Sequence, residues 1–131
     1  MPRTAAPARR SLPNQVRIIG GQWKRTLLPV ADRPGLRPTP DRVRETLFNW
    51  LGQDLSGWRC VDAFAGTGAL GFEAGSRGAA DVLLVEAEGA LVDQLRAVVK
   101  RLVAQNVPVQ RGEALSGLAG QAAGSVDLRV R

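Results

Sequence analysis

The sequence has little of what defines several classes of protein. Its single cysteine, Cys60, cannot form an internal disulfide, and such sparing use of cysteine is typical of a reducing cytosol. No apolar run approaches the roughly 18–20 residues that cross a bilayer. The arginines near the N-terminus are not followed by the apolar segment of a secretory signal. We therefore expect a cytoplasmic protein with no membrane partner, in which Cys60 is a buried structural thiol.

What is present is a globular composition with unevenly distributed charge. The 131 residues are 44% hydrophobic and 23% charged, which predicts one folded domain. Residues 1–60 hold 11 Lys and Arg against 4 Asp and Glu, a net of +7, whereas residues 61–131 hold 7 against 8, a net of −1. This segregation predicts that the first half contacts a polyanion and the second half binds a cofactor. The alternative is an ordinary basic surface.

The first 57 residues divide into an arm and an extension. Residues 1–14, rich in Pro, Ala and Arg, predict a flexible basic arm. Within residues 15–57, the segments 16–19 and 23–28 around the pair Gly20-Gly21 predict a β-hairpin. The prolines of residues 29–40 predict a loop.

A helix is expected to follow this loop. Thr39 is the expected N-cap, with Pro40 at the first helical position, and Gly52 is suited to end the helix. Arg42 and Arg44 lie off the expected apolar face, so both are predicted to be free to contact a ligand or RNA. That face is formed by positions i, i+4, i+7 and i+8, namely Val43, Leu47, Trp50 and Leu51.

Residues 58–131 alternate between strand and helix patterns. The expected strands are 59–63, 82–85, 107–110 and 126–130, and the expected helices are 69–76 and 88–105, with a helical turn at 114–118. The segment 82–85 is wholly apolar, as strands buried on both faces of a parallel sheet are. The alternation predicts an α/β fold with a Rossmann-like, doubly wound parallel sheet.

A glycine loop with an acid in front of it is the most informative motif. Asp62 ends a predicted strand, and Gly66 and Gly68 follow just before a predicted helix. Glycines let the backbone approach a ligand closely, and the helix start offers unpaired N–H groups. A pyrophosphate would be repelled by Asp62, whereas the α-amino group of S-adenosylmethionine would be attracted. The motif therefore predicts a methyl-donor site.

Other cofactors fit parts of the same pattern. Gly66-x-Gly68-x-x-Gly71, with Glu86 20 residues after Gly66, also satisfies the dinucleotide fingerprint, so an NAD(P)-binding Rossmann protein is an alternative. A P-loop is excluded because no Lys-Ser/Thr follows Gly71. Glu86, at the end of the second strand, is suited to accept hydrogen bonds from a ribose diol. Glu113 is either a partner for the adenine amine or a solvated loop acid.

Three stretches carry a resemblance to a known family. Residues 17–23 read RIIGGQW, residues 35–39 and 41–51 read GLRPT and DRVRETLFNWL, and residues 62–71 read DAFAGTGALG. Together they closely resemble the RsmD family, the bacterial 16S ribosomal RNA guanine-N2 methyltransferases of the small subunit. The likeness runs from about Val16 to Leu118, and its N-terminal motifs are specific to this family rather than to methyltransferases at large.

The resemblance implies a cofactor, a partner and two groups of site residues. It implies S-adenosyl-L-methionine as the cofactor and 16S rRNA of the small ribosomal subunit as the partner. We also expect no metal and a monomeric protein. The predicted cofactor residues are Asp62, Phe64, Ala65, Gly66, Thr67, Gly68, Glu86 and Glu113. The predicted RNA contacts are Arg17, Trp23, Lys24, Arg25, Arg37, Arg42 and Arg44.

One departure from the family pattern concerns catalysis. In the family, the fourth strand runs into Asp/Asn-Pro-Pro-Phe/Tyr, which holds the target base. This sequence contains no Pro-Pro dipeptide and no tyrosine, and residues 126–131 read VDLRVR. We therefore expect a chain truncated at the C-terminus, with an incomplete sheet and no catalytic residues of its own. At most weak donor binding and little or no methyl transfer are expected, and a non-catalytic RNA-binding fragment is a second alternative.

The implied chemistry is compatible with the absence of histidine. In a full-length relative the guanine N2 attacks the sulfonium methyl in line, and orientation supplies most of the rate. No strong general base is required, because the amine proton can leave after the attack. Rotation of the base out of its stack is the expected route to N2.

Overall fold

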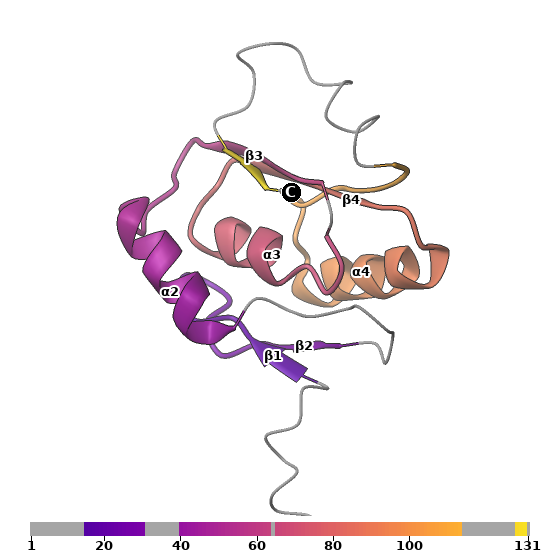
Figure 1. The fold of residues 1–131 in the computed structure, drawn as a ribbon, viewed down its shortest axis with the longest axis horizontal. Coiled ribbons are helices and arrows are strands. Elements are labelled where there is room, and N and C mark those ends of the chain that lie inside the picture. The colour runs from indigo at the N-terminus through magenta and orange to yellow at the C-terminus, as the bar shows by residue number, and fades with distance from the viewer. Residues whose placement is uncertain (1–14, 31–39, 64, 114–127, 131) are drawn as a thin grey trace, which may run out of the picture.

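The computed structural model describes residues 15–30, 40–63, 65–113 and 128–130 (Figure 1). The expected arm 1–14, the N-cap Thr39, Phe64, Arg37 and the helical turn at 114–118 lie outside these residues. The elements in chain order are β1 (Gln15–Arg17), β2 (Leu27–Pro29), α2 (Asp41–Trp50), β3 (Arg59–Asp62), α3 (Ala69–Ser76), β4 (Asp81–Glu86), α4 (Gly89–Leu102), β5 (Val109–Arg111) and β6 (Leu128–Val130).

Strands β3 to β6 form one parallel sheet in the order β5-β4-β3-β6. The chain moves outward from β3 through β4 to β5, and then returns to the opposite side of β3 with β6. The strand order therefore reverses at β3, and in doubly wound sheets ligands bind outside the carboxyl ends of the strands at such a point. The predicted α/β fold with a doubly wound parallel sheet is confirmed.

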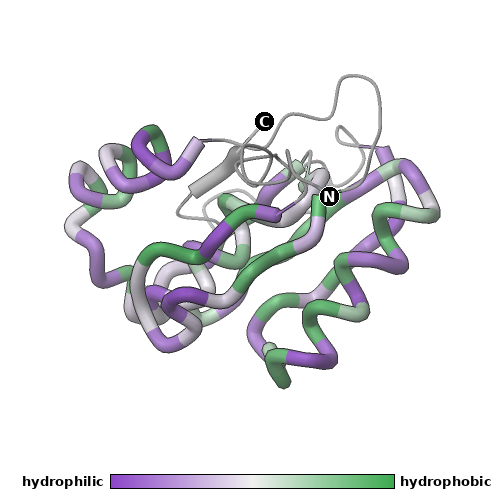
Figure 2. The backbone as a smooth tube through the Cα atoms, turned by 90° about the horizontal axis from the view of Figure 1, so that it is seen from below, coloured by the Kyte–Doolittle hydropathy of each residue, from purple (hydrophilic) through white to green (hydrophobic). Residues whose placement is uncertain are grey.

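The described helices all lie on one side of this sheet, with the hairpin β1-β2 on their far side (Figure 1). Helix α3 lies in the centre, and its residues from Gly71 to Ser76 are all buried. Helix α4 alternates between hydrophobic and hydrophilic residues along its length (Figure 2), and it buries Leu91, Leu95 and Val98. Three layers therefore result, in which α3 is covered by the sheet on one side and by the hairpin on the other.

Several element boundaries differ from the expected ones by a few residues. Helix α4 ends at Leu102 rather than at residue 105, because Val103 adopts a left-handed conformation with φ of 53°. Strand β5 begins two residues later than predicted. Cys60 is buried in β3, as expected of a structural thiol.

The hairpin is shorter than predicted. Only Gln15–Arg17 and Leu27–Pro29 pair as strands, and most of the expected return strand forms a loop instead. The backbone N–H groups of Gln22 and Trp23 donate to the carbonyl and hydroxyl oxygens of Ser76, at 2.8 Å and 2.9 Å. A Cβ on Gly21, whose φ is 81°, would lie 1.9 Å from the Ser76 carbonyl oxygen. The loop therefore packs backbone to backbone against the end of α3.

The predicted buried face of α2 is right for Leu47 and Leu51, which are partly buried and pack against the core, and wrong for Val43 and Trp50. Val43 and Trp50 are 54% and 81% exposed, whereas Arg44 and Phe48 are buried. The apolar pattern misled the prediction because an arginine occupies a position at the centre of the buried face. Arg44 is therefore not free to contact RNA.

Arg44 is buried because it meets a buried acid, Glu73 of α3. Arg44 Nη1 and Arg77 Nε donate to the two carboxylate oxygens of Glu73, each at 2.9 Å. The backbone N–H groups of Ile19 and Gly20 donate to the same two oxygens, also at 2.9 Å. Arg44 also pairs with Asp41 and donates to the Arg17 carbonyl oxygen at 2.9 Å. One carboxylate thus joins α2, α3 and the hairpin.

Removal of the Glu73 carboxylate should strongly destabilise the fold. In Glu73→Ala two guanidinium groups and two backbone N–H groups lose a buried acceptor, and breaking a buried pair in this way costs about 3–5 kcal/mol. Urea unfolding followed by circular dichroism should show that loss. Asp93→Ala removes an exposed acid from α4 and should change the free energy of unfolding by no more than about 0.5 kcal/mol. Equal midpoints for the two variants would contradict the role given to Glu73.

Candidate cofactor site at the carboxyl edge of the sheet

The ends of β3 and β4 bring the predicted acids to one edge of the sheet. Asp62 and Leu84 are register partners, and Glu86 ends β4 two residues further on. Asp62 is only 4% exposed and has interaction partners, whereas Glu86 is half-buried. Because the strand order reverses beside β3, this edge is where the topology predicts a ligand.

Glu86 holds the glycine loop as well as the edge of the sheet. Its Oε1 accepts a hydrogen bond from the Gly66 N–H and its Oε2 accepts one from the Glu88 N–H, each at 2.9 Å. Its backbone carbonyl accepts a hydrogen bond from the Gly112 N–H at 3.0 Å. Glu86 therefore joins the loops that follow β3, β4 and β5. The sequence pattern predicted a ribose contact here but not this structural role.

The loop between β3 and α3 depends on its two glycines. Gly66 and Gly68 have φ of 54° and 82°, in the left-handed region that glycine adopts without strain. Thr67 is buried, and its hydroxyl accepts a hydrogen bond from the Ala69 N–H at 3.2 Å. Ala65 is also buried, and its N–H donates to the Val85 carbonyl oxygen at 3.0 Å. The predicted residues from Ala65 to Gly68 therefore form one tightly held turn.

Glu113 lies just beyond β5 at the same edge of the sheet. It is exposed, and it follows Arg111, the register partner of Glu86, by two residues. Arg111 itself reaches the start of α4, since a Cβ on Gly89 would lie 3.0 Å from its Nη1. Sequence reasoning did not single out Arg111, although it is the one cation in the segment from 102 to 113.

The predicted RNA-contacting residues separate into three groups. Arg17, Lys24, Arg25 and Arg42 are exposed. Trp23 is half-buried and packs toward α3, because a Cβ on Gly75 would lie 3.1 Å from its ring atom Cζ3. Arg44 is buried in the ion-pair cluster described above, so its predicted role as a surface contact is wrong.

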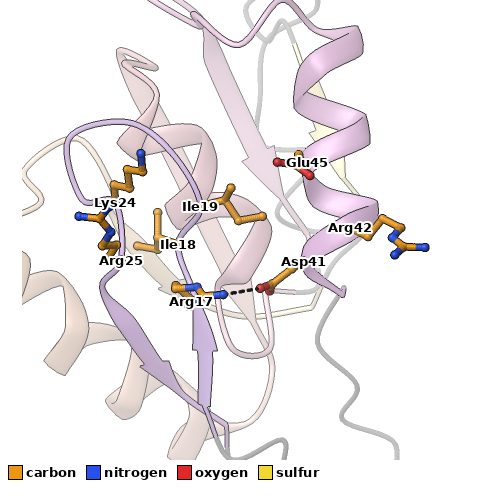
Figure 3. Close-up of a pocket in the computed structure, with 8 residues that line it drawn as sticks. All are labelled: Arg17, Ile18, Ile19, Lys24, Arg25, Asp41, Arg42 and Glu45. Atoms are coloured by element: carbon orange, nitrogen blue, oxygen red, sulfur yellow. Dashed lines mark ion pairs between the residues drawn. The ribbon is translucent and has the colours of Figure 1, made fainter. Parts of the chain in front are cut away.

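The four exposed cations surround one cleft between the hairpin loop and α2 (Figure 3). This cleft encloses about 430 Å³. Lys24 and Arg25 lie on the hairpin side and Glu45 on the α2 side, while Arg42 extends outward from α2. Arg17 pairs with Asp41 across the cleft at 3.7 Å. The hairpin and α2 thus face one cleft, which is lined by four cations and by the two acids Asp41 and Glu45.

The buried acid Glu73 was missed by sequence reasoning, although the sequence carries a signal for it. It is the only charged residue in the apolar segment 69–76. Burial of a charged side chain is costly unless ion pairs and hydrogen bonds compensate it. That requirement would have directed attention to arginines elsewhere in the chain.

The described residues contain neither a metal site nor a membrane-spanning helix. Among the described residues, no group of His, Cys, Asp and Glu is arranged to hold a metal ion. Within the same residues, no helix has the length and apolar character needed to cross a membrane.

Solved structures define the class of the fold. A putative methyltransferase from Escherichia coli matches with a TM-score of 0.72 and 53% identity, over 80% of this chain and 57% of that chain. A precorrin-6Y C5,15-methyltransferase from Geobacter metallireducens shares the fold, with a TM-score of 0.58 and 23% identity over 72% of this chain and 49% of that chain. The fold is that of the class I methyltransferases.

Sequence comparisons define the family. The family described as Conserved hypothetical protein 95 matches residues 16–128. Ribosomal RNA small subunit methyltransferase D of Escherichia coli K12 is 54% identical over 105 residues, which are 80% of this chain and 53% of that protein. The same-named protein of Haemophilus influenzae is 51% identical over 82 residues, 63% of this chain and 42% of that protein. The chain belongs to this family, the RsmD family, and spans about half the length of the curated relatives it matches.

A side chain at Gly68 should disrupt the turn that forms the site. A Cβ there would lie 2.5 Å from Phe72 Cε2 and 2.8 Å from Leu95 Cδ2. Gly68→Ala should therefore lose about 1–3 kcal/mol of stability from overpacking, in addition to the strain of its positive φ.

Gly57→Ala is the matched control for this substitution, because Gly57 also has a positive φ of 84° but no atoms near its Cβ. Thermal unfolding of both variants separates the contribution of packing from that of backbone strain. Equal losses of stability would show that the packing around Gly68 has no effect.

Proposed function

We propose that this chain carries the donor-binding and RNA-contacting part of an S-adenosylmethionine-dependent methyltransferase that modifies the exocyclic N2 of a guanine in 16S ribosomal RNA. The observation that carries the proposal is the carboxylate of Asp62 at the tip of β3, just before the paired glycines and at the reversal of strand order. Membership of the RsmD family supports it. The same proposal includes a monomeric protein in the cytoplasm.

The residues present fit the donor better than a dinucleotide. Asp62 is almost wholly buried, and a cation beside it would be attracted in surroundings of low dielectric constant. The same carboxylate would repel a pyrophosphate. When bound, S-adenosylmethionine supplies a methyl group on a positively charged sulfur. The proposed role of Asp62 is to hold the amino group of that molecule, with the backbone from Ala65 to Gly68 beside it.

Glu86 has capacity for a ligand in addition to its two backbone hydrogen bonds. Each carboxylate oxygen has two lone pairs, and each accepts one backbone hydrogen bond at 2.9 Å. A ribose hydroxyl could therefore be accepted without loss of the loop contacts. Phe64 and Glu113 complete the proposed donor residues, Glu113 as the partner of the adenine amine.

The proposed RNA surface is the basic face of the hairpin and α2. It comprises Arg17, Lys24, Arg25 and Arg42. Trp23 and Arg37 are proposed as further RNA contacts, and Arg37 lies outside the described residues. Electrostatic attraction to phosphates would hold the RNA there and would weaken as salt is added. Arg44 is not part of this surface. Its buried ion pair with Glu73 fixes the position of α2, and so the position of the cations on α2.

The proposed methyl transfer depends mainly on how the guanine amine and the donor methyl group are oriented toward each other. The guanine amine is the nucleophile, and its proton can leave after the attack, so no histidine is needed. The base would have to leave its stack to reach the edge of the sheet. The residues of this chain would contribute by binding the donor, by excluding water around Asp62 and by holding the RNA backbone.

Donor binding tests the proposal directly. Isothermal calorimetry should detect S-adenosylmethionine and should detect no NAD(P). Asp62→Asn preserves the shape of the side chain but removes its charge, and loss of a charged hydrogen bond is worth about 1.5–3 kcal/mol. The variant should therefore bind the donor roughly ten-fold to one-hundred-fold more weakly.

Asp81→Asn is the control for this experiment, since Asp81 begins β4 at the opposite edge of the sheet. That variant should bind the donor as the unmodified chain does. Binding of NAD(P) in place of the donor would favour an oxidoreductase, and unchanged affinity in Asp62→Asn would refute the role of its carboxylate. Salt-dependent RNA affinity without any donor binding would favour a non-catalytic RNA-binding protein.

A further inference from the structure

The basic cleft continues into a second cavity along α2. The first cavity, about 430 Å³, is lined by the hairpin and the N-terminal half of α2. The second, about 660 Å³, is lined by the hairpin loop, by the C-terminal half of α2 and by the end of α3. Ile19, Lys24 and Glu45 line both cavities. We call these two adjoining cavities together the trough. Both volumes lie within the range of small-ligand sites.

The two ends of the trough differ in chemistry. Four cations, Arg17, Lys24, Arg25 and Arg42, and two acids, Asp41 and Glu45, line the first cavity, so cations outnumber acids at that end (Figure 3). The second cavity contains three side-chain amides, those of Gln22, Asn49 and Gln53. All three residues are exposed. Amides present both donors and acceptors and match the edges of nucleic-acid bases, whereas cations match phosphates.

Four charged residues line the amide end, and two of them, Arg77 and Asp54, have partners within the protein, while Lys24 and Glu45 carry opposite charges. Arg77 lines this cavity, but its Nε is paired with Glu73 and its guanidinium lies 4.9 Å from the centre of the Phe48 ring. Hydrogen bonds from the hydroxyl and backbone N–H of Ser56 lower the pKa of the exposed Asp54. An acid at this end disfavours a phosphate and leaves the amides as the groups available to a neutral base.

Backbone strain is concentrated at the trough. Among the described residues, three that are not glycine have positive φ, namely Arg25, Gln53 and Val103. Arg25 lines the cationic end and Gln53 lines the amide end. Such conformations cost energy and tend to persist where they serve a function. Each of these two residues is thus held in an unfavourable conformation at the point where its side chain lines the trough.

The trough leads away from the proposed donor site. Helix α2 runs alongside α3 in the same direction, since Arg44 meets Glu73 and Phe48 lies beside Arg77. Helix α3 begins at the glycine loop, so the cationic end of the trough is the end nearer that loop. The amide end lies beside Ser76, Arg77 and Gly78 at the far end of α3. Ten helical residues span about 15 Å, which is the scale of the trough.

We propose that the trough binds an unpaired segment of the RNA strand, with phosphates at Lys24 and Arg25 and a splayed base at Asn49 and Gln53. This inference rests on the proposed function and adds a base-contacting site remote from the methyl donor. An unpaired strand is favoured over a duplex because the major groove of an RNA duplex is too deep and narrow for side chains to read the bases, whereas an unpaired strand exposes their edges. The segment would anchor the RNA while the target base reaches the donor edge.

Fluorescence anisotropy tests the proposal with a short labelled RNA in single-stranded and duplex form, without donor. The single strand should bind more tightly than the duplex. The double variant Lys24→Ala/Arg25→Ala should reduce the slope of log affinity against log salt by roughly 1 to 1.5, as expected for the loss of two phosphate contacts on a single strand. The double variant Asn49→Ala/Gln53→Gly should weaken binding about ten-fold and leave that slope unchanged.

Matched controls lie on α4 and just beyond it. Lys100→Ala and Gln105→Ala remove an exposed cation and an exposed amide and should leave affinity and slope unchanged. Glycine is chosen at position 53 because it accepts the φ of 65° without strain. Unfolding midpoints equal to that of the unmodified chain confirm that each variant is folded.

Two results would overturn the inference. Unchanged single-strand affinity in Asn49→Ala/Gln53→Gly would exclude a base at the amide end, even if Lys24 and Arg25 bind phosphate. Equal affinity for duplex and single strand would exclude an unpaired ligand. In both cases the proposed function could stand, because calorimetric donor binding and RNA binding by the basic surface would persist. Failure of the unmodified chain to bind either RNA would instead remove the RNA partner itself.

Discussion

The fold depends on one buried carboxylate, that of Glu73. It accepts hydrogen bonds from Arg44 of α2, from Arg77 of α3 and from the backbone of Ile19 and Gly20 in the hairpin, all at 2.9 Å. A charge in a fully buried helix is tolerated only when every lone pair is matched in this way. Since α3 also begins at the glycine loop, the same helix carries the proposed donor site at one end and the hairpin at the other.

The carboxyl edge of the sheet, where the proposed cofactor site lies, depends on a second carboxylate that also joins several segments of the chain. Glu86 joins the loops after β3, β4 and β5 through three backbone hydrogen bonds, two of them to its side chain. Asp62 lies at the end of the adjacent strand, at the same edge of the sheet, and is buried. The two acids place negative charge at this edge, beside Arg111 at the end of β5, while four exposed cations lie on the hairpin and α2. The surface proposed for a cationic cofactor is thus separate from the surface proposed for RNA.

Much of this arrangement could be predicted from the sequence, because strand and helix periods are local signals. The alternation from residue 59 onward predicted the parallel sheet, and the acid before the glycines was correctly placed at the end of a strand. The buried face of α2 could not be predicted in this way, because Arg44 looks like a surface residue until Glu73 is known to face it. The shortened hairpin has the same cause, since contacts of its loop with Ser76 replace strand pairing. Long-range polar contacts decided each of these cases.

The most direct test of the account is a crystal structure of the chain with S-adenosylmethionine bound. The account predicts that the amino nitrogen of the ligand lies within hydrogen-bonding distance of the Asp62 carboxylate, with the ribose beside Glu86. An Asp62 side chain turned away from the ligand, or a site that stays empty at saturating concentration, would contradict it.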